Sequence, residues 1–145
     1  MRYLVYTDGA GSLAFNTIGC SYLILTDSTY ISSESVQLGG LDNPTYAETI
    51  SVGLASAYFI DNIKLEPTDV IEFNIDCAST ISFYNRYIDN SKEVSSKIQS
   101  IQGSVTIVRQ LSSMCRVRFQ KVKGHKNVIN PNTYVDRLAK LAIRR

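Results

Sequence analysis

The sequence predicts an α/β fold: a five-stranded mixed sheet, with three antiparallel strands followed by parallel crossovers, flanked by helices. Three observations predict it. The first 40 residues contain β-rich runs separated by turn residues, and the remainder alternates helical periodicity with short β-rich runs. The 145 residues, 44% of them hydrophobic, are enough for one core. The expected element order is βββαβααβα, in a single domain spanning residues 1–145.

The first three strands follow from β-branched and aromatic runs bounded by turn signals. The first run ends at Asp8-Gly9, a pair typical of tight hairpin turns. The second and third are separated by the polar residues 27–29, so the three runs predict an antiparallel meander. The expected strands are residues 2–7, 18–26 and 30–38.

The later elements alternate between helices and strands. Asn43-Pro44 interrupts the β pattern, and apolar positions at helical spacing then continue to about Asn62. Pro131 opens a final helix, and right-handed crossovers place the later strands parallel to the first. The other expected elements are strands at 70–75 and 116–122 and helices at 78–88 and 92–113, although Gly103 leaves open a strand at 105–108.

Composition excludes several classes of protein. The apolar runs are far shorter than the roughly 20 residues of a membrane-spanning helix, and an acid occurs too early for a signal peptide. The three cysteines have no CxxC spacing, which argues against a disulfide scaffold or a structural zinc site. We therefore expect a soluble, cytoplasmic, monomeric protein without a membrane association, and the sequence indicates no protein partner.

Charge is unevenly distributed along the chain. Residues 109–145 contain ten Lys or Arg and one acid, Asp136, which gives a net charge of +9, whereas residues 1–108 carry −7. This asymmetry indicates an anionic partner. The alternative is a basic last helix whose charged face is simply solvated.

Four acids lie at strand ends or in the first turns of helices: Asp8, Glu48, Asp76 and Asp136. Each also has an ordinary structural explanation. Asp8 fits a turn with Gly9, and Glu48 fits a capping box with Thr45. Asp76 fits a helix cap, and Asp136 fits an i,i+4 ion pair with Lys140.

These explanations do not account for the expected convergence of the acids. If the first and fourth strands are parallel neighbours, Asp8 and Asp76 leave the sheet at the same edge. Two carboxylates at about 5 Å repel by roughly 3 kcal/mol at an effective dielectric constant of 20, so such a cluster needs cations. Carboxylate ligands favour Mg²⁺ or Mn²⁺, and two such ions can hydrolyse a phosphodiester. The sequence therefore predicts metal-assisted hydrolysis of a nucleic acid.

The chain resembles type 1 ribonuclease H over nearly its whole length. The resemblance rests on five motifs in matching order and spacing: YTDGA at 6–10, YAET at 46–49, IDCAS at 75–79, VKGHK at 122–126 and VDRLAK at 135–140. It implies that the four acids hold two Mg²⁺ ions, with Mn²⁺ as a substitute. It also implies cleavage of the RNA strand of an RNA/DNA hybrid, leaving 5′-phosphate and 3′-hydroxyl ends, with His125 assisting proton movement or product departure.

The resemblance also implies contacts with the substrate. RNA differs from DNA by its 2′-hydroxyl, which the resemblance assigns to the backbone of Gly9 and Ala10 and to the side chains of Asn43 and Thr45. Asn132 corresponds to an asparagine near the site. The loop before it is one residue longer than in well-known members of the family, so Asn130 is the alternative.

Three positions bear on the choice of substrate. Lys123 is placed to neutralise a phosphate, or is a solvated loop charge. Thr45 and Ala78 stand where the family often has asparagine and glutamine, so two substrate contacts are altered. These departures leave open a nuclease of the same fold that acts on DNA or structured nucleic acid, and a non-catalytic nucleic-acid-binding module.

Overall fold

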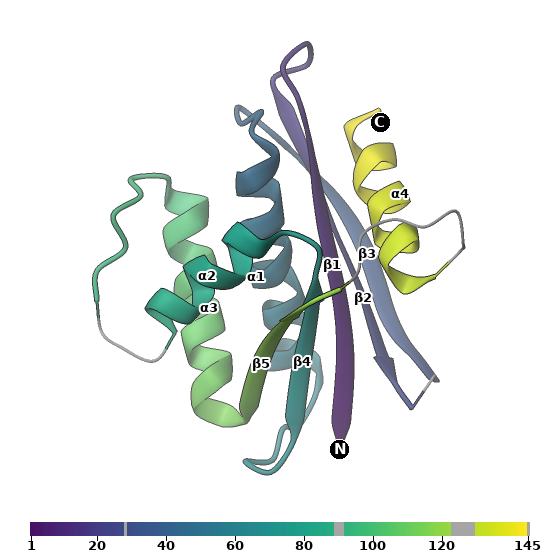
Figure 1. Ribbon diagram of the computed structural model, residues 1–145, viewed down its shortest axis with the longest axis vertical. Helices are drawn as coiled ribbons and strands as arrows, with labels where there is room; N and C mark the ends of the chain where they lie inside the picture. Colours follow the sequence, from purple (N-terminus) through teal and green to yellow (C-terminus); the bar gives the residue numbers. More distant parts are fainter. Residues whose placement is uncertain (28, 89–91, 123–129, 145) are drawn as a thin grey trace.

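Five strands form one mixed sheet in the order β3-β2-β1-β4-β5 (Figure 1). The computed structural model describes residues 1–27, 29–88, 92–122 and 130–144. β1 pairs antiparallel with β2, β2 pairs antiparallel with β3, and β4 lies parallel to both β1 and β5. The predicted fold class is therefore confirmed. The strands are β1 Arg2–Ser12, β2 Thr17–Thr26, β3 Thr29–Gly39, β4 Val70–Ile75 and β5 Arg116–Lys121.

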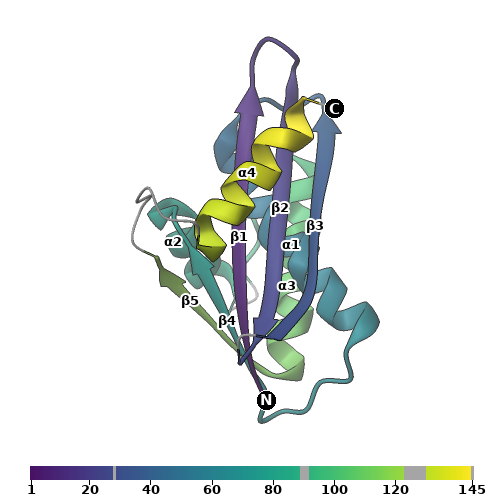
Figure 2. The same cartoon turned by 90° about the vertical axis from the view of Figure 1, so that its right-hand side faces the viewer.

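The helices cover the two faces of the sheet unequally. Three of them, α1 Pro44–Asn62, α2 Ala78–Tyr87 and α3 Gln99–Met114, lie on one face, and α4 Pro131–Ile143 lies on the other. Figure 2 shows α4 crossing the antiparallel half of the sheet, over β1, β2 and β3. None of the helices in the described residues is long and apolar enough to cross a membrane.

Asparagine caps begin the two helices that carry candidate acids. The side chain of Asn43 accepts a hydrogen bond from the backbone N–H of Thr45 at 2.9 Å, and Pro44 occupies the first turn, where its missing N–H costs nothing. Asn130 and Thr133 form a reciprocal capping box at the start of α4. The expected capping box between Thr45 and Glu48 is wrong, because the helix begins earlier and Asn43 is its cap.

The main core lies between the sheet and the three-helix face. The ring of Phe119 stacks on Phe73 and Tyr84, with centroids 5.2 Å and 5.4 Å apart, which joins β4 and β5 to α2. The buried hydroxyl of Tyr84 donates to the carbonyl of Thr49 at 2.6 Å, so α2 is also fixed to α1. This packing holds the helix that follows Asp76 against the helix that carries Glu48.

The expected end of the first strand is wrong. β1 does not end at Asp8-Gly9: it continues to Ser12, because Gly9 and Ala10 extend the ladder by pairing with Cys20 and Gly19. Asp8 therefore lies within the strand, opposite Ser21, and not in a turn.

The third helix is shorter than expected at its N-terminal end. It begins at Gln99 and not near Lys92, and the alternative strand at 105–108 is wrong because those residues are helical. The hydroxyl of Ser96 accepts a hydrogen bond from the N–H of Ile98, a local bond that competes with helix formation.

Candidate carboxylate site

Parallel pairing of β1 with β4 brings Asp8 and Asp76 to neighbouring strands. The register aligns Thr7 with Ile75, so the two acids occupy the next positions along adjacent strands. Neighbouring strands lie about 4.8 Å apart. The predicted proximity of these two acids along the sheet is confirmed, although only β4 ends there. Asp76 precedes Cys77, which is the N-cap residue of α2, so the expected role of Asp76 as the cap is wrong.

Glu48 reaches Asp8 because α1 packs directly against a glycine of β1. A Cβ atom at Gly9 would lie 2.5 Å from the carbonyl carbon of Ala47 and from the backbone nitrogen of Glu48, closer than any side chain permits. The absence of a side chain at Gly9 therefore allows helix and strand to approach closely. The N–H of Gly9 donates to Oδ1 of Asp8 at 2.8 Å, which orients that carboxylate.

The two carboxyl groups share a proton in the absence of a cation. Burial, followed by hydrogen bonding and repulsion from Asp8, raises the pKa of Glu48 to about 10. Burial also raises the pKa of Asp8, while its hydrogen bond with Glu48 acts in the opposite direction. Glu48 is therefore protonated near pH 7 and donates to Asp8.

Asp136 approaches the pair from the opposite face of the sheet. It lies on α4, and its carboxyl group interacts with Asp8 by hydrogen bonding and charge, which further raises the pKa of Asp8. Its Oδ2 also accepts a hydrogen bond from Nζ of Lys140 at 3.0 Å. The i,i+4 ion pair is therefore confirmed, and it coexists with the approach to Asp8.

The carboxylate oxygens of this site are the kind of ligand that a hard divalent cation prefers. Oε2 of Glu48 is buried, and no hydrogen-bond donor among the described residues pairs with it. Oxygen-only donors of this kind suit Mg²⁺ and Mn²⁺. Within residues 1–27, 29–88, 92–122 and 130–144, however, no group of three or more His, Cys, Asp or Glu side chains is close enough to hold a metal ion. Asp8 thus contacts Glu48 and Asp136 in separate pairs, and the four acids do not surround one shared point where an ion could sit.

The two candidate asparagines have different surroundings. Asn130 is occupied by the capping box of α4, where its side chain accepts from the N–H of Thr133 at 3.0 Å. Asn132 is 4% exposed, and both polar atoms of its side chain lack a partner within the described part of the chain. This geometry favours Asn132 over Asn130 as a ligand-binding residue. His125 and Lys123 lie outside the described residues.

The other expected substrate residues surround the beginning of α1. Gly9 and Ala10 lie on β1, next to the first turn of α1, where Asn43 and Thr45 are located. Oδ1 of Asn43 is occupied by the helix cap, whereas Thr45 lines a small cavity of about 140 Å³ with Ser79 and Phe83.

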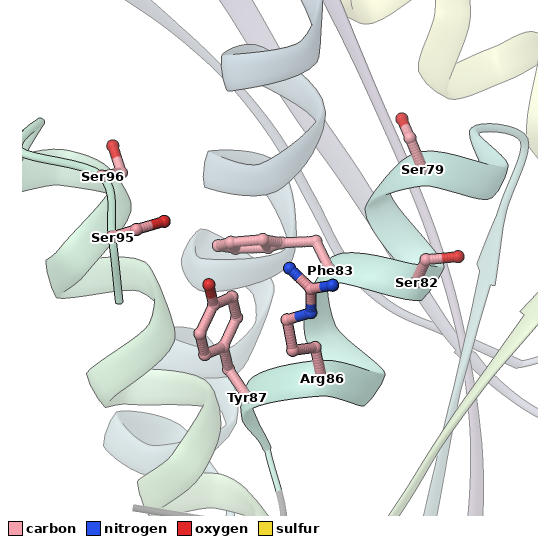
Figure 3. Close-up of a pocket in the computed structure, with 7 residues that line it drawn as sticks. All are labelled: Ser79, Ser82, Phe83, Arg86, Tyr87, Ser95 and Ser96. Carbon is pink, nitrogen blue, oxygen red and sulfur yellow. The ribbon is translucent and has the colours of Figure 1, made fainter. Parts of the chain in front are cut away.

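A second cavity, of about 500 Å³, lies against α2 (Figure 3). The two share Ser79, Phe83 and Ser96, so together they form a groove from the start of α1 along α2. Arg86 and Tyr87 border the far end of the groove. The charge pattern did not predict this groove. The signal was the repeated serines at 79, 82, 95 and 96 together with two aromatic residues one helical turn apart.

The strand order and the positions of the helices define the class: an RNase H-like α/β fold. Two solved structures show the same fold. RNase H1 from the halophilic archaeon Halobacterium salinarum matches with a TM-score of 0.72 and 16% identity, over 99% of this chain and 98% of that one. The N-terminal RNase H domain of a Mycobacterium tuberculosis protein gives the same score and identity, over 99% and 94%. No family model and no curated sequence matches the chain. The resemblance to type 1 ribonuclease H is thus confirmed as a likeness of fold.

Proposed function

We propose that this protein is a metal-dependent endonuclease that hydrolyses the RNA strand of RNA/DNA hybrids and leaves 5′-phosphate and 3′-hydroxyl ends. One observation carries the proposal. In an RNase H fold, Glu48 of α1 and Asp136 of α4 both interact with Asp8 of β1, and Asp76 directly follows the adjacent strand β4. Surface ion pairing does not explain a buried carboxyl pair of this kind, which costs stability unless a proton or a cation neutralises it.

Asp8, Glu48, Asp76 and Asp136 would hold two Mg²⁺ ions, or Mn²⁺ in their place. When bound, these ions supply the Lewis-acid stabilisation that phosphodiester hydrolysis needs. The protein contributes the position of the carboxylates: the N–H of Gly9 orients Asp8, and the close packing of α1 on β1 presents Glu48 to it. A small movement of the Asp136 carboxylate away from Lys140 would bring the fourth ligand residue to the ions.

The proton on Glu48 gives the site a built-in dependence on pH. With a pKa of about 10, Glu48 holds a proton near neutrality, and that proton must leave before both of its oxygens can act as ligands. The affinity for a divalent cation should therefore rise with pH across the neutral range. The buried side chain of Asn132, which has no hydrogen-bond partner among the described residues, is placed to contact a bound ligand at the start of α4.

The groove beside α2 is suited to a nucleic-acid strand. It combines the hydroxyl groups of Ser79 and Ser96 with the aromatic ring of Phe83 and the guanidinium of Arg86. Hydroxyl and guanidinium groups contact phosphates, and aromatic rings stack on bases. Its near end, at Thr45, leads to the helix that carries Glu48.

A cleavage panel tests the proposal. The purified protein is incubated with Mg²⁺ and with an RNA/DNA hybrid, a duplex RNA and a duplex DNA of one sequence. We expect cleavage of the hybrid RNA strand, and we expect Asp76→Asn to reduce it about 100-fold or more with little change in folding. Asp61→Asn, the same change at the exposed end of α1, is the control and should leave the rate unchanged.

Other outcomes of the cleavage panel would favour one of the two alternative functions. Cleavage of duplex DNA in preference to the hybrid would replace the proposed substrate, and the altered Thr45 and Ala78 positions would then account for it. Hybrid binding without cleavage in either Mg²⁺ or Mn²⁺ would contradict catalysis and favour a binding module.

A further inference from the structure

Two completely buried serines connect the elements that carry three of the acids. Ser21 lies on β2 and Ser51 on α1, and both side chains are 0% exposed. Neither follows from the carboxylate pattern in the sequence. Buried hydroxyl groups are retained when they satisfy specific partners, so their partners show what they hold together.

Each hydroxyl contacts the backbone at, or immediately before, an acid. Oγ of Ser51 lies 2.6 Å from the carbonyl oxygen of Asp8 and 2.7 Å from that of Ala47, the residue before Glu48. Oγ of Ser21 donates to the carbonyl of Val135, the residue before Asp136, at 2.6 Å.

The two serines are also joined to each other. The N–H of Ser21 donates to Oγ of Ser51 at 3.2 Å, and Oγ of Ser21 lies 3.3 Å from the carbonyl of Asp8. The network therefore extends from α1, through β1 and β2, to α4. It links both faces of the sheet at the position of Asp8.

Helix formation alone does not require this network. Carbonyls inside helices accept bonds from N–H groups four residues later, and a mid-helix serine often adds a bond to the same carbonyl. Ser56, on the same helix and also 0% exposed, does this: its hydroxyl donates to Val52 at 2.8 Å within α1. Ser51 differs because it also contacts Asp8 on β1, and Ser56 is thus a matched control.

We propose that Ser21 and Ser51 are positioning residues that set the relative placement of Asp8, Glu48 and Asp136 for cation binding. The role of the cation rests on the proposed function. The serines contact the backbone and not the substrate or the ion. Mg²⁺ requires near-ideal octahedral geometry, and metal sites depend on groups that fix their ligands within about 0.5 Å. Loosening the backbone beside three acids should therefore weaken cation binding more than it weakens the fold.

The test compares Ser21→Ala, Ser51→Ala and Ser56→Ala in the full chain without nucleic acid. Free Mn²⁺ is measured by electron paramagnetic resonance, and the side-chain carboxyl ¹³C resonances are recorded in the metal-free proteins. We expect Ser21→Ala and Ser51→Ala to bind Mn²⁺ about tenfold more weakly and to shift the resonances of the three acids. Ser56→Ala should change neither Mn²⁺ binding nor the carboxyl resonances, even if its melting temperature falls as much as that of the other two variants.

The proposal is overturned if Ser21→Ala and Ser51→Ala leave both Mn²⁺ binding and the carboxyl resonances unchanged, or if Ser56→Ala reproduces their effects. If one of the two variants fails to fold, the other decides. If the wild type binds Mn²⁺ but cleaves no hybrid, the proposed function fails while the positioning role is still measured. If the wild type binds no Mn²⁺, the carboxyl resonances alone decide.

Discussion

Glu48 has the most unusual environment of the candidate residues. Glu48 is 9% exposed, its carboxyl group lies beside Asp8, and Oε2 is buried without a hydrogen-bond donor in the described part of the chain. The sequence placed Glu48 in the first turn of a helix and so at one end of the sheet. It could not predict that Glu48 would be protonated, because burial depends on Gly9 and on the approach of α1 to β1. Proton and cation therefore compete for the same oxygens.

The protonation of Glu48 makes the metal-free protein less stable as the pH rises. Because the folded-state pKa of about 10 exceeds the ordinary glutamate pKa of 4.5, the native state binds more protons than the unfolded chain between these two pH values. Stability should therefore fall from about pH 5 to pH 10. Glu48→Gln cannot titrate, so at pH 9 its melting temperature in EDTA should exceed that of the wild type by several degrees, since about 1 kcal/mol corresponds to roughly 3 °C here.

Asp69→Asn provides a control of opposite sign. Hydrogen bonds from the N–H of Glu66 and from the N-terminal ammonium lower the pKa of Asp69, so its contribution is present above the unfolded-state pKa and lost in acid. The variant should melt below the wild type at pH 7 and approach it below pH 3. Parallel pH profiles for Glu48→Gln and the wild type would show that Glu48 is ionised in the empty protein.

At the scale of the elements, glycines decide how closely the helices approach the sheet. The missing side chain of Gly9 allows α1 to pack closely on β1. Gly19 on β2 likewise allows α4 to approach, since a Cβ atom at Gly19 would overlap the carbonyl oxygen of Ala139. The helical periodicities of both helices could be predicted, but these contacts could not, because a single glycine in a strand has several explanations. Likewise, Val94 and Ile98 fit a helical stripe but pack on the core from outside α3.

Gly19→Ala should therefore displace α4 and Asp136. We expect a loss of about 1–3 kcal/mol in the free energy of unfolding, measured by urea denaturation, because rigid backbone opposes the new methyl group. Gly103→Ala is the matched control: no atom of another described element lies within 4 Å of its added Cβ, and alanine is the better helix former by up to about 1 kcal/mol. If Gly19→Ala were as stable as the wild type, α4 would not depend on this close contact.

At the scale of the whole molecule, the topology could be predicted because β-rich runs and segments with helical periodicity follow one another along the chain. Parallel pairing of β1 and β4 then made the proximity of Asp8 and Asp76 predictable. The separation of these acids into pairwise contacts among the described residues could not be predicted, because it depends on side-chain positions such as the ion pair of Asp136 with Lys140. The serines and aromatic residues of the groove along α2 are visible in the sequence at 79–96, but the packing of these residues beside Thr45 at the start of α1 is not.

The most direct test is a crystal of the metal-free protein soaked in Mn²⁺, with anomalous diffraction used to locate the ions. We expect anomalous peaks about 2.0–2.6 Å from carboxylate oxygens of Asp8, Glu48, Asp76 and Asp136, with Asp136 moved away from Lys140. A soak that places no ion among these residues, and leaves Glu48 paired with Asp8 and Asp136 paired with Lys140, would contradict a common divalent-cation site.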